Sequence, residues 1–465
     1  LAFVFPGSAN HYPGMGRGLA LAFPEILAAH EAENTRLRSQ LQPELFWDDF
    51  DPAELAERCE ELIFGQVSFS VLSVDALGAF GIRPAAVIGY SLGEAAALFG
   101  MRAWRDRDEM LERVRASGLF SRDLAGELRA VRQAWGGPDG GPAPRWLAGV
   151  VDRPAGVVSG ALDGRARVYL LIVNTPNECV IGGDAGAVTD VVTELGAHFY
   201  PLPGVASLHC EVVAPVAAQY RQLHVRATEA PDGIRFYSGF AARSYALDSE
   251  HAAAAILDQA LHGVDFPATV ARAHADGVRV FVEVGPGASG TRMIGDILRG
   301  KRFAAWTAAD SARPEPENLL RAALGVYAEG HPVDFGPVFE RAESAVTVSA
   351  ARSFDVQRWH APAAAPRPPR PVPAVSAGRA PSAPGHTALL TAYEDSVTAH
   401  LRAHRAYLAM SGEVRDVMVE AVRLQCALTA ADTSTVAPKV FMDRAACLQY
   451  AVGSIAAVLG PDFAE

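Results

Sequence analysis

Apolar residues are spaced in two different ways along the first third of the chain. Short continuous apolar runs at Leu1–Phe5 and Ala85–Tyr90 predict buried strands. Apolar residues three and four positions apart predict helices over Phe23–Leu37 and Val67–Phe80, and an Ala-rich helix is expected to begin at Ser91. Strands that alternate with helices are typical of a mostly parallel sheet covered on both faces. This part of the chain is therefore predicted to be α/β.

A different pattern follows, in which the predicted order is strand, helix, strand, strand, helix, strand. The strands are expected at Trp146–Val151, Val168–Val173, Glu178–Ile181 and His198–Leu202, and the helices at Pro154–Leu162 and Ala185–Leu195. This order is that of a ferredoxin-like unit. The α/β pattern returns after it, with a buried strand at Val278–Val284. We therefore expect residues 136–203 to form a small subdomain inserted into a large α/β subdomain made of residues 1–135 and 204–340.

The rest of the chain has another character. Residues 341–385 include a stretch rich in Pro and Ala, which is typical of a semi-extended linker. Residues 386–465 carry helical spacing and are predicted to be a helical C-terminal extension without identifiable chemistry. Because the sequence begins without Met and inside a predicted strand, we expect it to be part of a longer polypeptide.

Composition narrows the class of protein. The chain has 465 residues, of which 50% are hydrophobic and 20% charged, as in globular proteins of two or three folding units. The excess of 53 acidic over 41 basic residues argues against a general nucleic-acid binder. The five cysteines form no C-x-x-C pair, which favours a reducing cytosol over a disulfide framework or a zinc site. We see neither a signal peptide nor a continuous apolar run of membrane-spanning length, and we expect a cytoplasmic protein.

The clearest chemical motif is Gly89-Tyr90-Ser91-Leu92-Gly93, a G-x-S-x-G between a predicted strand and a predicted helix. In that context the glycines allow a tight turn, a nucleophile elbow, that exposes the serine hydroxyl. The alternative is a small residue at an ordinary tight turn. Ser91 is therefore the candidate nucleophile, and a serine nucleophile needs a base. Position alone singles out none of the thirteen histidines.

Four motifs in order resemble the malonyl-CoA:acyl-carrier-protein transacylases and the acyltransferase domains of polyketide synthases. Phe3–Gly16 resembles the opening F-x-F-P-G-Q-G-x-Q-x-x-G-M-G of that family, and Gly89–Glu94 resembles its G-H-S-x-G-E. His209 matches the histidine that ends its specificity motif, and Phe281–Pro286 resembles its closing E-x-G-P strand. The resemblance covers about residues 1–340. Within this family, the sequence most resembles the iterative synthases of the enediyne and polyunsaturated fatty-acid type.

The resemblance implies a ping-pong acyl transfer. His209 would take the proton of Ser91, which would attack malonyl-CoA and form a malonyl-serine ester. The phosphopantetheine thiol of an acyl carrier protein would then take the malonyl group, as in polyketide and antibiotic biosynthesis. The implied partners are that carrier protein and a neighbouring ketosynthase domain. The resemblance implies no bound cofactor and no metal.

The same resemblance assigns the supporting residues. The backbone amides of Ser8 and Leu92 would form the oxyanion hole, even though Ser8 replaces the usual Gln. Gln259 would stand behind His209, where the family uses an amide or a backbone carbonyl and hydrolases use a carboxylate. The alternative for Gln259 is an ordinary residue on a helix surface.

The substrate-binding residues depart from the family pattern. Tyr90 replaces the usual histidine before the nucleophile, and the position of the arginine that binds the malonyl carboxylate falls on Ala116. Either a local bulge brings Arg115 into that place, or no arginine is used and polar groups such as the Tyr90 hydroxyl hold the carboxylate. Leu208, the residue before the catalytic histidine, is bulky and should crowd an α-methyl group, which favours malonyl.

Two other function classes fit part of the pattern. A serine hydrolase or editing thioesterase shares the elbow but normally orients its base with Asp or Glu. A non-catalytic docking module would need neither a nucleophile nor a base. Transfer of the acyl group to a thiol rather than to water separates the first class from an acyltransferase, and an acyl adduct on Ser91 separates the second.

Overall fold

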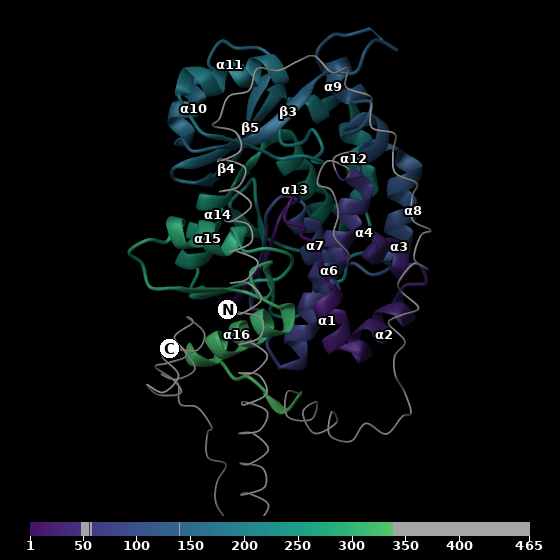
Figure 1. Ribbon diagram of the computed structural model, residues 1–465, viewed down its shortest axis with the longest axis vertical. Helices are drawn as coiled ribbons and strands as arrows, with labels where there is room; N and C mark the ends of the chain where they lie inside the picture. The colour runs from purple at the N-terminus through teal and green to yellow at the C-terminus, as the bar shows by residue number, and fades with distance from the viewer. Residues whose placement is uncertain (48–54, 56–57, 139, 338–465) are drawn as a thin grey trace, which may run out of the picture. The chain divides into compact units, whose positions relative to one another are not determined.

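The computed structural model describes residues 1–47, 55, 58–138 and 140–337 (Figure 1). The predicted linker at 341–385 and the predicted helical extension at 386–465 lie outside the described residues. Within the described part, helices surround two sheets, a larger one of six strands and a smaller one of five.

The larger sheet has the strand order β11-β10-β1-β2-β7-β8. Its strands are β1 (Ala2–Phe5), β2 (Ala86–Gly89), β7 (Arg235–Ser238), β8 (Arg243–Tyr245), β10 (Val280–Glu283) and β11 (Ala304–Thr307). All neighbours are parallel except β7 and β8. Every residue of β1, β2 and β10 is buried, as expected for parallel strands covered on both faces. Because Phe5 pairs with Gly89, the loops that follow β1 and β2 leave the sheet side by side.

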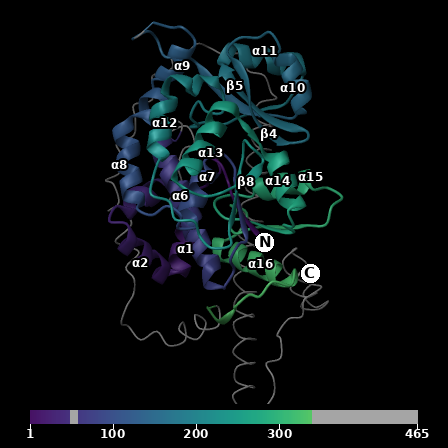
Figure 2. The ribbon, with the colours of Figure 1, turned by 180° about the vertical axis from the view of Figure 1, so that it is seen from behind.

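Helices pack on both sides of this sheet, with α6 and α7 on one side and α14 and α15 on the other (Figures 1 and 2). The helices are α1 (Arg17–Ala22), α2 (Pro24–Glu33), α3 (Leu37–Leu41), α4 (Pro43–Phe46), α6 (Cys59–Ala79), α7 (Gly93–Gly100), α8 (Arg107–Ser117), α9 (Arg129–Ala134), α12 (Ala217–His224), α13 (Ser249–His262), α14 (Phe266–Ala275), α15 (Ser289–Ile297) and α16 (Glu315–Ala328). A π-helical turn spans Leu119–Asp123 and a 3₁₀ turn spans Glu211–Val216.

Two predicted helices differ from the observed ones. The helix expected over Phe23–Leu37 ends earlier, because Asn34 is extended and ends α2, and a second helix, α3, begins only at Leu37. The helix expected from Val67 begins at Cys59, so α6 is longer than predicted. Helix α6 is long and apolar enough to cross a membrane by length and composition, but most of it is buried against neighbouring elements such as α7 and α3.

The smaller sheet has the order β6-β3-β5-β4-β9. Its elements are β3 (Trp146–Val151), α10 (Ala155–Leu162), β4 (Val168–Thr175), β5 (Glu178–Asp184), α11 (Ala185–Leu195), β6 (Phe199–Pro201) and, from later in the chain, β9 (Val264–Asp265). The first six follow each other in the predicted order. Helices α10 and α11 pack on this sheet at the top of Figure 1. Leu171 and Val180 belong to the same buried cluster as Val4 and Ile88, so a common core joins the two sheets.

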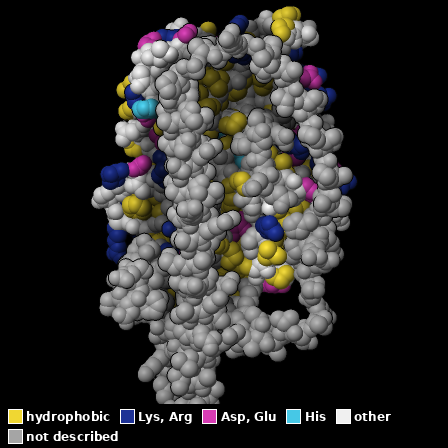
Figure 3. All heavy atoms as spheres, in the orientation of Figure 1, with side chains coloured by type: hydrophobic (Ala, Val, Ile, Leu, Met, Phe, Trp, Pro, Cys, Tyr) yellow, Lys and Arg dark blue, Asp and Glu magenta, His cyan; other side chains and the backbone are white. Residues whose placement is uncertain are grey.

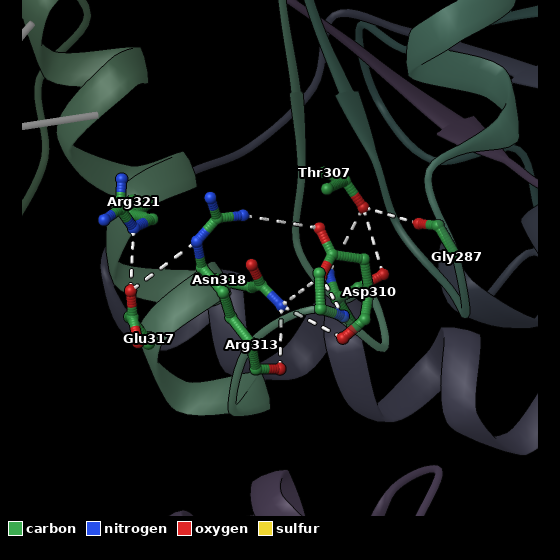
Figure 4. A network of polar contacts seen from close by, with 9 residues as sticks. Gly287, Thr307, Asp310, Arg313, Glu317, Asn318 and Arg321 are labelled. Carbon is green, nitrogen blue, oxygen red and sulfur yellow. Dashed lines mark hydrogen bonds and ion pairs between the residues drawn. The ribbon is translucent and has the colours of Figure 1, made fainter. Parts of the chain in front are cut away.

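A polar network holds together the loops that follow β10 and β11 in the larger sheet (Figure 4). The Thr307 hydroxyl donates to the carbonyl of Gly287 at 2.6 Å, and the Asn318 amide donates to the carbonyl of Asp310 at 3.2 Å. Gly287 lies in the turn that leads into α15, so this network holds the start of that helix. On the face of the molecule in Figure 3, basic and acidic side chains are interspersed along the visible edges.

Candidate active site

Ser91 stands in a strained turn between β2 and α7. Its φ of 55° is in the left-handed region, where non-glycine residues are uncommon. The flanking glycines are required by space: a Cβ on Gly93 would lie 2.0 Å from the carbonyl oxygen of Phe5, and a Cβ on Gly89 would lie 2.2 Å from the amide nitrogen of Glu94. The predicted arrangement of strand, tight turn and helix is therefore present, and it holds the serine at the N-terminus of α7.

His209 lies directly against this serine. The Ser91 hydroxyl donates to Nε2 of His209 at 2.7 Å, and Nδ1 of His209 donates to the main-chain carbonyl of Gln259 at 2.9 Å. Burial lowers the pKa of the imidazole to about 4, so the ring is neutral at neutral pH. With the Nδ1 proton engaged, the lone pair of Nε2 faces the serine, which is the arrangement that a general base requires.

Gln259 orients the histidine with its main chain and not with its side-chain amide, whose nitrogen instead donates to the carbonyl of Ser91 at 3.0 Å. The residue is buried in α13, so the surface alternative is wrong. Among the described residues no carboxylate bonds to His209. One glutamine thus contacts both members of the pair, with its carbonyl on the base and its amide on the backbone of the nucleophile.

Buried Glu94 connects the helix that follows the nucleophile to the loop after β7. Its Oε1 accepts the main-chain N–H of Gly239 at 2.6 Å. Burial raises the pKa of this carboxyl to about 8, which favours the neutral acid near neutral pH. The contact fixes the first turn of α7 against the loop that follows β7.

Ser8 and Leu92 both line the cavity in front of Ser91. Within the described part of the chain, neither main-chain N–H donates to another protein atom. Leu92 caps the N-terminus of α7, where the helix dipole favours negative charge. The geometry suits an oxyanion hole, and that role stays a prediction.

The structure corrects the assignment of Arg115 as a substrate-binding residue. Its neighbour Val114 is buried in α8 and lines the cavity, whereas Arg115 is exposed and does not line it. One residue along a helix is a rotation of about 100°, and no bulge interrupts α8 to undo it. Tyr90 and Leu208, by contrast, do line the cavity.

A chain of polar contacts that the sequence did not reveal begins at Tyr90. Its hydroxyl donates to Oδ1 of Asn174 at 2.7 Å, and the Asn174 amide donates to Oε1 of Glu178 at 2.9 Å. Arg292 closes the chain with two hydrogen bonds of 2.9 Å to the Glu178 carboxylate. The residues come from the elbow, β4, β5 and α15, so only the packing of the two sheets brings them together.

These residues line one cavity of about 330 Å³. Its lining residues fall into two groups, which we call the polar arm and the apolar arm. In the polar arm, hydrogen bonds link several lining side chains to one another, and in the apolar arm the lining residues come mainly from α6, α7 and α8. The polar arm is lined by Ser8, Asn10, Tyr90, Asn174, Glu178, Ser289 and Arg292. The apolar arm is lined by Phe64, Val67, Leu92, Ala95, Phe99, Met110, Val114, Phe120, Leu223 and Ile256, and the polar side chains of Arg107, Tyr220 and His224 also line the cavity from α8 and α12. Ser91 and His209 line the same cavity.

Metal-ligating side chains do not gather in this part of the molecule. Among the described residues, no group of three or more His, Cys, Asp or Glu side chains is arranged to hold a metal ion. The chemistry that the arrangement can perform is nucleophilic attack by a serine that a neutral, buried histidine activates.

Comparisons with known proteins agree with this geometry. The sequence profile of the acyl transferase domain family matches residues 2–331. The chain is 26% identical over 322 residues to a polyunsaturated fatty acid synthase protein of Thraustochytrium sp., a match that covers 62% of this chain and 15% of that protein. It is 24% identical over 291 residues to the malonyl CoA-acyl carrier protein transacylase of Bacillus subtilis, covering 62% of this chain and 87% of that enzyme.

A solved structure is similar to the same region. The acyltransferase domain from the second module of the salinomycin polyketide synthase superposes with a TM-score of 0.60 at 24% identity, covering 75% of this chain and 78% of that one. This likeness shows the fold. The first curated relatives are much longer, since the chain spans only about 15% of the length of the Thraustochytrium synthase protein.

Proposed function

Because the chain belongs to the acyl transferase domain family, we propose that it moves a malonyl group from malonyl-CoA to the phosphopantetheine thiol of an acyl carrier protein. The observation that carries the proposal is the 2.7 Å contact between the Ser91 hydroxyl and Nε2 of a neutral His209. The transacylase of Bacillus subtilis, whose name specifies malonyl-CoA and an acyl carrier protein, matches the chain over 87% of its own length and supports this choice of donor and acceptor.

The reaction follows from the positions of the two side chains. His209 Nε2 takes the hydroxyl proton while Ser91 Oγ attacks the thioester carbonyl, and the developing oxyanion is stabilised by the amides of Ser8 and Leu92. The carbonyl re-forms, the C–S bond breaks, and the CoA sulfur takes the proton from His209. The carrier thiol then gives its proton to His209 and attacks the ester carbonyl. The C–O bond to Ser91 breaks, and His209 returns the proton to Ser91 Oγ.

The carboxylate of malonyl needs a partner, and we propose Arg292 in place of the exposed Arg115. Arg292 lines the polar arm and is itself exposed, so it stands at the mouth of the cavity. Glu178 accepts two of its five N–H donors, which leaves donors for a second carboxylate. Leu208 lines the same cavity and would crowd an α-methyl branch, which favours malonyl over methylmalonyl.

The setting that we propose is an iterative synthase of the enediyne or polyunsaturated fatty-acid type, with a ketosynthase in the same cytoplasmic polypeptide. The match to the polyunsaturated fatty acid synthase protein of Thraustochytrium sp. supports this setting. The six-stranded part would be the hydrolase-like subdomain and the smaller sheet the ferredoxin-like one, since the strand order β6-β3-β5-β4 suits such a unit. A hydrolase is disfavoured because a carbonyl, not a carboxylate, orients His209.

Intact-protein mass spectrometry tests the proposal. Incubation with malonyl-CoA should add one malonyl group, Ser91→Ala should abolish the adduct, and holo acyl carrier protein should discharge it faster than water does. Discharge to water at the same rate would support a hydrolase. Absence of an adduct with any acyl-CoA would overturn the proposal and favour a docking module.

A further inference from the structure

The apolar arm follows helix α7 away from the nucleophile. Leu92, Ala95 and Phe99 line it, and their spacing of three and four residues places them on one face of the helix. From Leu92 to Phe99 the helix rises about 10 Å at 1.5 Å per residue. The cavity therefore runs along about two turns of helix, starting beside Ser91.

Other residues that line this arm also lie on helix faces. Met110 and Val114 are one turn apart on α8, both are buried and both line the cavity. Phe64 and Val67 of α6 are buried and line it too. These hydrocarbon side chains stabilise an apolar chain and carry no hydrogen-bond donors themselves, so the donor beside them is Arg107.

Arg107 marks the polar limit of the arm, one turn before Met110 on the same helix. It is buried and lines the cavity. Its Nε donates to Oε1 of Gln40 at 3.0 Å, while Nη2 is buried without a hydrogen-bond partner. A methyl group pressed against this guanidinium would remove it further from water, so Arg107 limits the length of an apolar occupant.

The space exceeds the needs of a malonyl group. An engineered apolar cavity of about 150 Å³ holds a benzene molecule. The whole cavity here, with its polar and apolar lining together, measures about 330 Å³ and is roughly twice as large, and hydrocarbon side chains of α6, α7 and α8 line part of it. An extended chain advances about 1.2 Å per bond, so an arm of about 10 Å takes a chain of about eight carbons.

We infer that the site also takes linear acyl groups of about six to eight carbons, held as esters on Ser91 with the chain in the apolar arm. This inference rests on the proposed acyl transfer by Ser91. The ester forms between Ser91 Oγ and the acyl carbonyl carbon, the CoA sulfur leaves, and His209 passes the serine proton to it. Malonyl and linear acyl groups would thus use different arms beside one nucleophile.

A chain-length series tests the inference on the full chain. Single-turnover acylation is measured with acetyl-, butanoyl-, hexanoyl-, octanoyl- and dodecanoyl-CoA, with malonyl-CoA as reference. The rate at limiting donor should rise up to about fourfold for each buried methylene, peak near octanoyl and fall at dodecanoyl. Ser91→Ala should give no adduct with any donor.

Two substitutions on α8 locate the chain. Val114→Phe fills the apolar arm and should lower the ratio of octanoyl to acetyl acylation at least tenfold. Ala116→Phe adds an aromatic ring on the exposed side of the same helix and should leave that ratio unchanged. If Val114→Phe does not fold, Ala95→Leu in α7 narrows the arm from the opposite wall and should act in the same direction.

The outcomes separate this inference from the proposed function. A protein that forms a malonyl adduct but acylates no faster with octanoyl than with acetyl overturns the inference and leaves malonyl transfer in place. A protein that forms neither adduct overturns both. If octanoyl is still preferred in both Val114→Phe and Ala95→Leu, the acyl chain lies outside the apolar arm, and this result would also contradict the inference.

Discussion

The two arms of the cavity differ in where their walls come from. The polar arm combines Asn174 and Glu178 of the smaller sheet with Tyr90 and Arg292 of the larger part, joined by hydrogen bonds across the boundary. The apolar arm is built from residues outside the inserted segment 136–203, mainly on helices around α7. Recognition of a carboxylate would therefore depend on how the two sheets are placed, whereas recognition of a hydrocarbon chain would depend mainly on the packing of the helices around α7.

The largest effect is expected at the point that both arms share. His209→Ala removes the base and should lower acylation about 10²- to 10⁴-fold for malonyl and octanoyl donors alike. The measurement is single-turnover acylation, with circular dichroism as the check on folding. A loss confined to one donor would show that the two arms do not share one reacting centre.

Arg292→Ala should separate the arms. Removing a charge-assisted partner of the carboxylate should lower malonyl acylation about tenfold while leaving octanoyl acylation within twofold, because the hydrocarbon chain lies elsewhere. Arg292→Lys keeps the charge but loses the paired hydrogen-bond geometry, so its rate of malonyl acylation should lie between those of the unchanged protein and Arg292→Ala. Equal losses for both donors would point to a structural role through Glu178.

The pH dependence should be common to both donors. Burial sets the pKa of His209 at about 4, so the base is free above that pH and is lost by protonation below it. Acylation should stay nearly level from pH 7 to pH 5 and then fall about tenfold per pH unit below pH 4, in buffers where circular dichroism shows the fold intact. A fall in the acylation rate around pH 6.5 for either donor would contradict a buried neutral base.

The smallest effect is expected at Arg115, which the sequence analysis considered as the partner of the malonyl carboxylate. Arg115→Ala should change malonyl acylation less than twofold, because this side chain is exposed and faces away from the cavity. Arg83→Ala, a change of the same size at another exposed arginine, serves as the matched control. A tenfold loss specific to Arg115→Ala would mean that Arg115, and not Arg292, holds the carboxylate.

Much of the fold could be predicted because the signals are local. The order from β3 to β6 came from alternating periods over some sixty residues, and the bounds of β3 and α11 agree with the expectation. Strands β7, β8, β9 and β11 were not predicted. Each has two to four residues, and β9 joins the smaller sheet only through its long-range pairing with β4.

The sequence by itself indicated the elbow, because a strand, two glycines and a helix are its local signature, although the close approach of Phe5 in β1 is what requires Gly93. Resemblance was needed to select His209, which lies far along the chain. Only the tertiary structure decided that the carbonyl of Gln259, not its amide, orients the base, that Arg115 faces outward, and that Arg292 completes a polar arm. These outcomes depend on helix rotation and on the packing of two sheets, which no local spacing of residues encodes.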